Sequence, residues 1–154
     1  MKKCALALTT LLVFALLFGT IGCGGGGNDK DEILRLLDEQ IVAMNNVDVQ
    51  TVYEQRTPGY KSRVTLEEYA AFIELVFGQY FREVVEGGKQ VKLTNLNVDV
   101  EGEWGYMTGQ LVLNGDVVLS YTDEAPDVWR KVGGTWYDAE ENPQAPGYDP
   151  NDLP

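Results

Sequence analysis

The chain has 154 residues and a formal net charge of -12, with 24 acidic and 12 basic side chains and no histidine. That length is enough for one ordinary domain, and the acidic balance excludes a basic nucleic-acid-binding surface. The lack of histidine excludes histidine-dependent catalytic triads and the usual zinc sites.

The first 22 residues have the pattern of a secretory signal. Lys2 and Lys3 give a positively charged start, and an uncharged apolar run follows over residues 5–18. Such a segment is removed from the mature protein and takes no part in its fold. Because the apolar stretch is just long enough to cross a bilayer, an uncleaved membrane helix is one alternative, and ordinary secretion is another.

The residues Thr20-Ile21-Gly22-Cys23 resemble the lipobox of bacterial lipoproteins, although Thr20 stands where that family prefers Leu. The resemblance implies that Cys23 is lipid-modified and becomes the first residue of the mature chain. It implies a protein anchored to the cell membrane on its extracytoplasmic side. Gly24 also permits sorting to an outer membrane where two membranes exist. Residues 23–28, which include four glycines, are then expected to be a flexible tether.

Two helices are predicted after the tether, over residues 30–45 and 49–55, from apolar side chains at helical spacing. Asp29 and Asp48 are the expected N-caps. The sequence Thr57-Pro58-Gly59 is expected to break the chain after the second helix.

A third helix is predicted over residues 66–85. Thr65 and Glu68 have the spacing of a capping box at its start, and Gly87-Gly88 follow its end. This helix has the widest apolar stripe of the three.

From residue 89 onward apolar residues alternate, which predicts strands. An irregularity at Thr94-Asn95 predicts a β-bulge, and Asn114-Gly115 is typical of a two-residue hairpin. The third strand is expected to be interrupted around residues 124–126. The predicted strands cover about 89–100, 104–113, 117–132 and 135–139, and the proline-rich acidic tail, 142–154, is expected to be irregular.

Helices followed by strands predict an α+β fold, with three helices packed on a curved antiparallel sheet of about four strands. The segment Trp-Arg-Lys-Val-Gly-Gly-Thr-Trp-Tyr-Asp, residues 129–138, resembles the end of the nuclear-transport-factor-2-like superfamily, also called cystatin-like or SnoaL-like. The short second helix and the break after it are similar as well, so the resemblance covers residues 29–141. It implies a cone-shaped domain with a pocket between the sheet and the first and third helices.

Eight side chains are expected to line that pocket: Tyr53, Tyr69, Phe72, Val76, Trp104, Tyr106, Tyr121 and Trp136. A tyrosine could stabilise an oxyanion, and a buried aspartate with a raised pKa could act as a base. Asp99 is the aspartate considered, but it shares the strand parity of the polar Asn97 and is expected to face water. The first helix has no tyrosine, so the ketosteroid-isomerase-like site of the family is not matched. Tyrosine and tryptophan rings in the sheet and helices are also well explained as core.

Acidic residues gather in two places, at Asp123, Glu124 and Asp127, and again after the last strand at residues 138–141. Oxygen-rich loops can bind calcium, but neither cluster has the pattern of a calcium-binding loop. Solvated surface charge is therefore expected, and no metal or cofactor is predicted.

Three functions remain open, because members of the superfamily include both enzymes and non-catalytic domains. The first is a membrane-tethered, non-catalytic domain that binds a small apolar ligand or another envelope protein. The second is an enzyme of isomerase, dehydratase or hydrolase type acting on a small organic molecule. The third is an accessory domain that forms a homodimer through its open sheet face. Convergence of Tyr53, Tyr106 and Tyr121 on a carboxylate would favour the enzyme, and a dry apolar cavity would favour binding.

Overall fold

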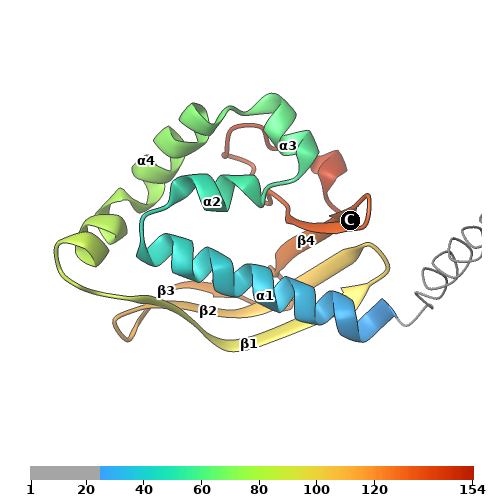
Figure 1. The fold of residues 1–154 in the computed structure, drawn as a ribbon, viewed down its shortest axis with the longest axis horizontal. Coiled ribbons are helices and arrows are strands. Elements are labelled where there is room, and N and C mark those ends of the chain that lie inside the picture. The colour runs from blue at the N-terminus through green and yellow to red at the C-terminus, as the bar shows by residue number, and fades with distance from the viewer. Residues whose placement is uncertain (1–24) are drawn as a thin grey trace, which may run out of the picture.

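A computed structural model describes residues 25–154, so the predicted signal, 1–22, and the predicted lipidation site Cys23 lie outside the described residues. The fold is α+β, as predicted, with helices on one side of an antiparallel sheet (Figure 1). In chain order the elements are α1 (Gly25–Asn45), α2 (Val49–Glu54), α3 (Pro58–Arg63), α4 (Leu66–Val85), β1 (Val91–Glu101), β2 (Trp104–Leu113), β3 (Asp116–Tyr121), β4 (Asp127–Val132), β5 (Thr135–Asp138) and the 3-10 helix η1 (Pro150–Asp152).

Two predicted helix starts are confirmed by their caps. The Asp48 side chain accepts a hydrogen bond from the backbone of Thr51 at the start of α2. Thr65 and Glu68 form both hydrogen bonds of the capping box at the start of α4. Each cap satisfies backbone N–H groups that have no partner within the helix.

The prediction of a simple break after α2 is wrong, because a fourth helix begins there. Pro58 occupies the first turn of α3, where its missing N–H costs nothing, and Thr57 caps the helix by accepting from the backbone of Tyr60. The proline that was expected to break the chain therefore begins a helix.

Helix α1 also begins earlier than predicted. It starts at Gly25, so three of the glycines expected in the flexible tether are helical. Asp29 is consequently inside the helix and does not cap it. Its carboxylate instead accepts hydrogen bonds from Lys131 Nζ at 2.5 Å and from Trp136 Nε1 at 3.1 Å.

The sheet has five strands where four were predicted, in the order β1-β2-β4-β5, and β3 also pairs with β2. The interruption expected within the third strand separates β3 from β4. One half of β2 pairs with β4 and the other half with β3. The predicted bulge is confirmed by a register shift between Thr94 and Asn97, where Asn95 has a φ of 54°, a conformation that asparagine tolerates well.

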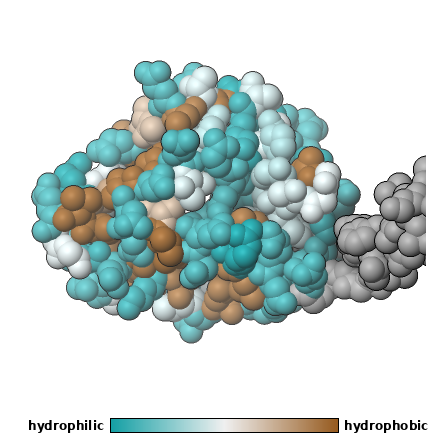
Figure 2. All heavy atoms as spheres, viewed as in Figure 1, coloured by the Kyte–Doolittle hydropathy of each residue, from teal (hydrophilic) through white to brown (hydrophobic). Residues whose placement is uncertain are grey.

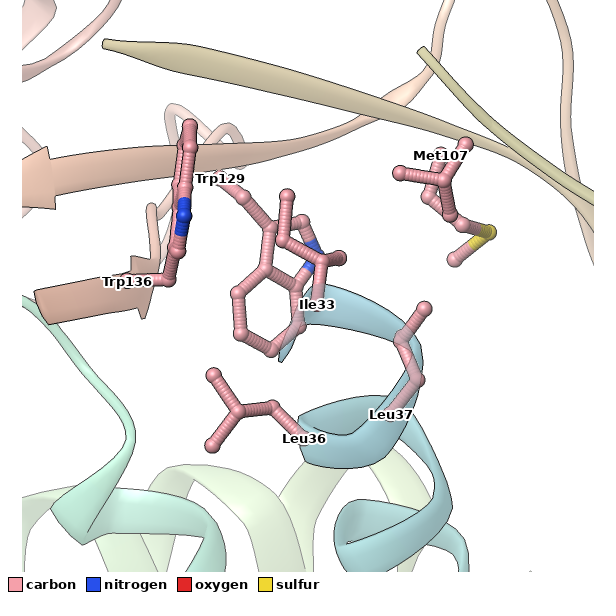
Figure 3. Packing of buried hydrophobic residues seen from close by; sticks show 7 residues of the cluster. Ile33, Leu36, Leu37, Met107, Trp129 and Trp136 are labelled. Carbon is pink, nitrogen blue, oxygen red and sulfur yellow. The ribbon is translucent and has the colours of Figure 1, made fainter. Parts of the chain in front are cut away.

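The main core lies between α1 and the sheet. Ile33, Leu36 and Leu37 of α1 pack against Met107, Trp129 and Trp136 of the strands (Figure 3). Two further apolar clusters join α2, α3 and α4 to one another and the ends of α1 and α4 to β1 and β2. Residues 25–154 thus contain their own hydrophobic core, the property of a domain that can fold alone.

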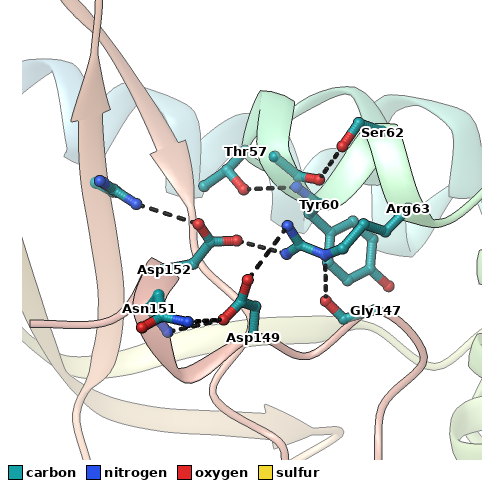
Figure 4. Close-up of polar contacts among 10 residues, drawn as sticks. Thr57, Tyr60, Ser62, Arg63, Gly147, Asp149, Asn151 and Asp152 are labelled. Atoms are coloured by element: carbon teal, nitrogen blue, oxygen red, sulfur yellow. Dashed lines mark hydrogen bonds and ion pairs between the residues drawn. The ribbon is translucent and has the colours of Figure 1, made fainter.

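The C-terminal tail has no regular structure apart from η1, in line with the prediction of an irregular segment, but it packs against the rest of the domain. Arg63 of α3 binds Asp152 and donates a hydrogen bond to the carbonyl of Gly147 (Figure 4). Asp152 also accepts from Arg130 of β4. Arginine pairing therefore holds the tail across α3 and β4.

Over residues 25–154, none of the helices combines the length and hydropathy needed to span a membrane.

Candidate functional site

A cavity of about 510 Å³ lies between the helices and the sheet, a size typical of small-ligand sites. Its walls come from α1, α2 and α4 on one side and from β1, β2 and β3 on the other. The start of β4 and the segment after β5 close one end. Most of the wall is apolar, and this includes Leu37, Ile41, Met44, Val49, Val52, Phe72, Phe77, Leu93 and Leu111.

The amphipathic pattern of the helices explains these apolar walls. Leu37, Ile41 and Met44 recur at helical intervals along α1 and share one face. Val76 of α4 lines the cavity and is still 44% exposed, so this side of the cavity is open to solvent. In the view of Figure 2, which is the same as in Figure 1, hydrophobic residues gather on the surface towards the end of the molecule where α4 lies.

The opposite end of the cavity is polar and strongly acidic. Asp127 is the first residue of β4, Asp138 is the last residue of β5, and Glu140 and Glu141 follow directly. Because β4 and β5 form an antiparallel pair, its register brings the start of one strand beside the end of the other. Arg56, just after α2, is the single basic residue that lines the cavity within residues 25–154.

Arg56 neutralises two of these four acids. Its Nη1 donates to Asp138 Oδ1 at 2.8 Å, and its Nη2 lies 3.7 Å from Glu140 Oε2. The guanidinium also lies 5.6 Å from the ring centre of Tyr69. The second oxygen of Asp138 accepts from Gln40 at 2.7 Å. Both oxygens of Asp138 are therefore already engaged.

Asp127 and Glu141 form no salt bridge within the part of the chain that the structure describes. Asp127 Oδ2 accepts from the indole of Trp129 at 2.8 Å, and Glu141 Oε1 accepts from the backbone N–H of Val128. Burial, with Asp138 close by, raises the pKa of Asp127 well above its ordinary value and the pKa of Glu141 to about 8. Both carboxyl groups therefore favour the neutral form unless a positive charge lies beside them, and a cation bound there would favour the ionised form.

Two tyrosines border the acidic end. Burial, together with Asp127, raises the pKa of Tyr121, so its phenol stays protonated. Tyr69 is 1% exposed, and its hydroxyl has no hydrogen-bond partner within the described residues. A buried hydroxyl without a partner costs free energy, which a bound ligand could recover.

Four of the eight predicted pocket residues line the cavity: Tyr69, Phe72, Val76 and Tyr121. The other four do not, and the strand register explains three of them. Trp136 points into the main core, whereas Trp104 and Tyr106 lie at the alternate, half-buried positions of β2. Tyr53 is buried among the helices, where its hydroxyl donates to the carbonyl of Val64.

The prediction of solvated acidic clusters is wrong for Asp127, Asp138, Glu140 and Glu141, whereas Asp123 and Glu124 are exposed. Strand alternation could have identified the buried acids, because Asp138 and Glu140 continue the parity of the buried Trp136. Asp99, as predicted, is exposed, and it accepts a hydrogen bond from Asn97.

The acidic end could hold a cation. Asp127, Asp138 and Glu141 each place a carboxylate oxygen within 4.8 Å of the others. Chemically, the arrangement can bind positive charge, or it can exchange protons with a bound molecule through its protonated carboxyl groups. Comparison with known proteins adds no assignment, since no protein-family model and no curated protein matches this sequence.

Proposed function

We propose that the protein is a membrane-tethered lipoprotein whose extracytoplasmic domain binds a small, mainly apolar molecule in the cavity without transforming it. The observation that carries this proposal is the cavity itself, which has apolar walls, one open side and one polar end. Such a combination is typical of sites for small organic ligands. The lipobox-like residues before Cys23 support the anchor, and the α+β order of elements agrees with a nuclear-transport-factor-2-like domain.

A neutral fluorescent dye tests the binding function. Phenylnaphthylamine becomes bright when it enters an apolar site, so residues 25–154 should increase its emission saturably. Val76→Trp should weaken this binding because a large ring at the open side blocks entry. Leu75→Trp is the matched control, since Leu75 is 84% exposed and does not line the cavity. No saturable emission, or equal losses in the two variants, would contradict the proposal.

The anchor has its own experiment. Intact mass of the membrane-extracted protein should match residues 23–154 plus lipid, and Cys23→Ser should abolish that species. The mass of the whole unmodified chain would contradict lipidation and would favour an uncleaved membrane helix.

A second candidate is an enzyme that uses acid–base chemistry in the same cavity. It is supported by the raised pKa values of Asp127 and Glu141, at the same end of the cavity as Tyr121, because such carboxyl groups could donate or remove a proton. Of the three tyrosines proposed to converge, only Tyr121 lines the cavity, and for that reason binding is preferred. Catalysis predicts that a ligand recovered after incubation differs in structure from the one supplied.

A further inference from the structure

We propose that the cavity takes an organic cation with a hydrocarbon body, whose positively charged head lies between Asp127 and Glu141. This inference rests on the proposed binding function and names the chemical class of its ligand. It follows from how charge is distributed over the cavity wall.

The acidic end has more acidic than basic side chains. Four carboxyl groups, those of Asp127, Asp138, Glu140 and Glu141, share the single guanidinium of Arg56. Arg56 is held by Asp138 and Glu140, and Asp138 is further engaged by Gln40. What remains is the buried carboxyl group of Asp127 and the half-buried one of Glu141, neither of which forms a salt bridge within the described residues.

Each member of that pair has one oxygen available. Trp129 donates to one oxygen of Asp127, and the backbone of Val128 donates to one oxygen of Glu141. No hydrogen bond within residues 25–154 reaches the second oxygen of either residue. A head group that donates hydrogen bonds and carries positive charge fits two such acceptors, because charge-assisted hydrogen bonds are the strong ones.

Tyr69 gives an independent indication of a ligand. Its side chain is almost completely buried and lines the same cavity, yet within residues 25–154 its hydroxyl has no hydrogen-bond partner, although the guanidinium of Arg56 lies 5.6 Å from its ring centre. Native proteins rarely leave such a group unsatisfied. The tyrosine hydroxyl can accept a hydrogen bond from a ligand, as an ammonium group requires.

The rest of the cavity distinguishes an organic cation from a metal ion. A calcium ion takes six to eight oxygen ligands, whereas both oxygens of Asp138 are already engaged here. A metal ion would also leave the apolar walls of α1 and α4 without contacts. A hydrocarbon chain attached to the cation would fill that space and remove apolar surface from water.

Competition against the bound dye tests the inference on residues 25–154 near neutral pH. The competitors are octylammonium, octanol and octanoate, which share a chain length and differ in the charge of the head. Octylammonium should displace the dye at about tenfold lower concentration than octanol, and octanoate should be the weakest. Asp127→Asn should reduce the preference for octylammonium over octanol towards one, with both concentrations measured against dye bound to the same variant. Asp123→Asn is the matched control, because Asp123 is exposed and does not line the cavity.

The outcomes separate this inference from the function it rests on. Dye displacement by octanol as strong as by octylammonium, or a preference for octanoate, overturns the cation inference and leaves the binding function standing. Failure of the dye itself to bind overturns both. A rise in melting temperature with calcium or manganese that Asp127→Asn abolishes, without any preference for octylammonium, replaces the organic cation by a metal ion. Glu141→Gln should reduce the preference for octylammonium in the same way as Asp127→Asn. This second variant tests the inference even if Asp127→Asn fails to fold.

Discussion

At the scale of single residues, Arg56 is the group on which the acidic end of the cavity depends. Its side chain is only 13% exposed, and it contacts the carboxylates of Asp138 and Glu140, which are also buried. Burial alone would lower the pKa of this guanidinium, but Asp138 opposite keeps it charged. Removing the arginine would leave two buried carboxylates without a counter-ion.

Arg56→Met should therefore lower the free energy of unfolding by about 3–5 kcal/mol, the usual cost of breaking a buried ion pair. Urea unfolding measures this. Arg82→Met is the control, because Arg82 and Glu74 are both more than half exposed and such surface pairs contribute about 0–1 kcal/mol. Equal losses of unfolding free energy in the two variants would mean that burial does not make the Arg56 pair more stabilising than a surface pair.

Glu141 makes stability depend on pH. Its pKa is raised from 4.5 to about 8, because of burial and then Asp138, with Arg56 acting in the opposite direction; Asp127 and Tyr121 lie at the same end of the cavity. A group with a raised pKa stabilises the fold below its unfolded pKa, and this stability is lost as pH rises through its folded pKa. The free energy of unfolding should fall between about pH 5 and pH 8, by roughly 1–3 kcal/mol.

Glu141→Gln should flatten that fall, because the amide oxygen can still accept from Val128 and has no proton to lose. Denaturant unfolding at several pH values would show the difference. A profile for Glu141→Gln identical to that of the unmodified protein would assign the dependence to other groups.

The acids at residues 138–141 show what sequence reasoning missed. A charged residue was predicted to be solvated because burial of charge is rare. The sequence shows that Trp136, Asp138 and Glu140 lie at alternate positions along and just after β5. Burial of the two acids, however, depends on pairing with Arg56, which lies about eighty residues earlier in the chain. Pairing across that distance has no signature in one sequence.

At the scale of elements, local signals predicted best. The bounds of α4, Leu66–Val85, and of β2, Trp104–Leu113, match the prediction, because a capping box and clean alternation are each determined by neighbouring residues. Helix α3 was missed because proline was treated as a helix breaker and not as a first-turn residue. Three predicted pocket residues, Trp104, Tyr106 and Trp136, do not line the cavity because side-chain direction depends on strand register.

The docking of the tail depends on one glycine. Gly147 has a φ of 72°, and a Cβ there would overlap Val64 at the end of α3. Gly147→Ala should lower the free energy of unfolding by about 2–4 kcal/mol, from both the backbone strain and the overlap. Gly134→Ala is the control, with a φ of 90° and open space around it, so it should cost only the backbone strain, about 1 kcal/mol. Thermal unfolding compares the two, and equal effects would mean that the tail is not tightly docked.

At the scale of the whole molecule, the charge of residues 25–154 determines how the domain meets a bilayer. All 24 acidic side chains and 10 of the 12 basic ones lie in these residues, since Lys2 and Lys3 precede them, so their formal net charge is -14. Anionic lipid headgroups repel an acidic surface over roughly a Debye length, about 8–10 Å at physiological salt. Residues 25–154 should therefore not co-sediment with anionic vesicles, and all membrane association should depend on Cys23. Co-sedimentation without the lipid would reveal a second membrane contact.

Helix α1 begins beside the proposed anchor, and Asp29 joins its first turns to Lys131 of β4 and Trp136 of β5. Tension on the anchor would enter the domain at this helix. The contacts of Asp29 with Lys131 and Trp136 would transmit that force to the β4–β5 hairpin, so α1 would not separate from the sheet before these contacts break. Under force from the membrane, the helical turn before Asp29 would therefore unfold first. The contacts of Asp29 would keep the rest of α1 on the sheet, and the cavity would keep its shape.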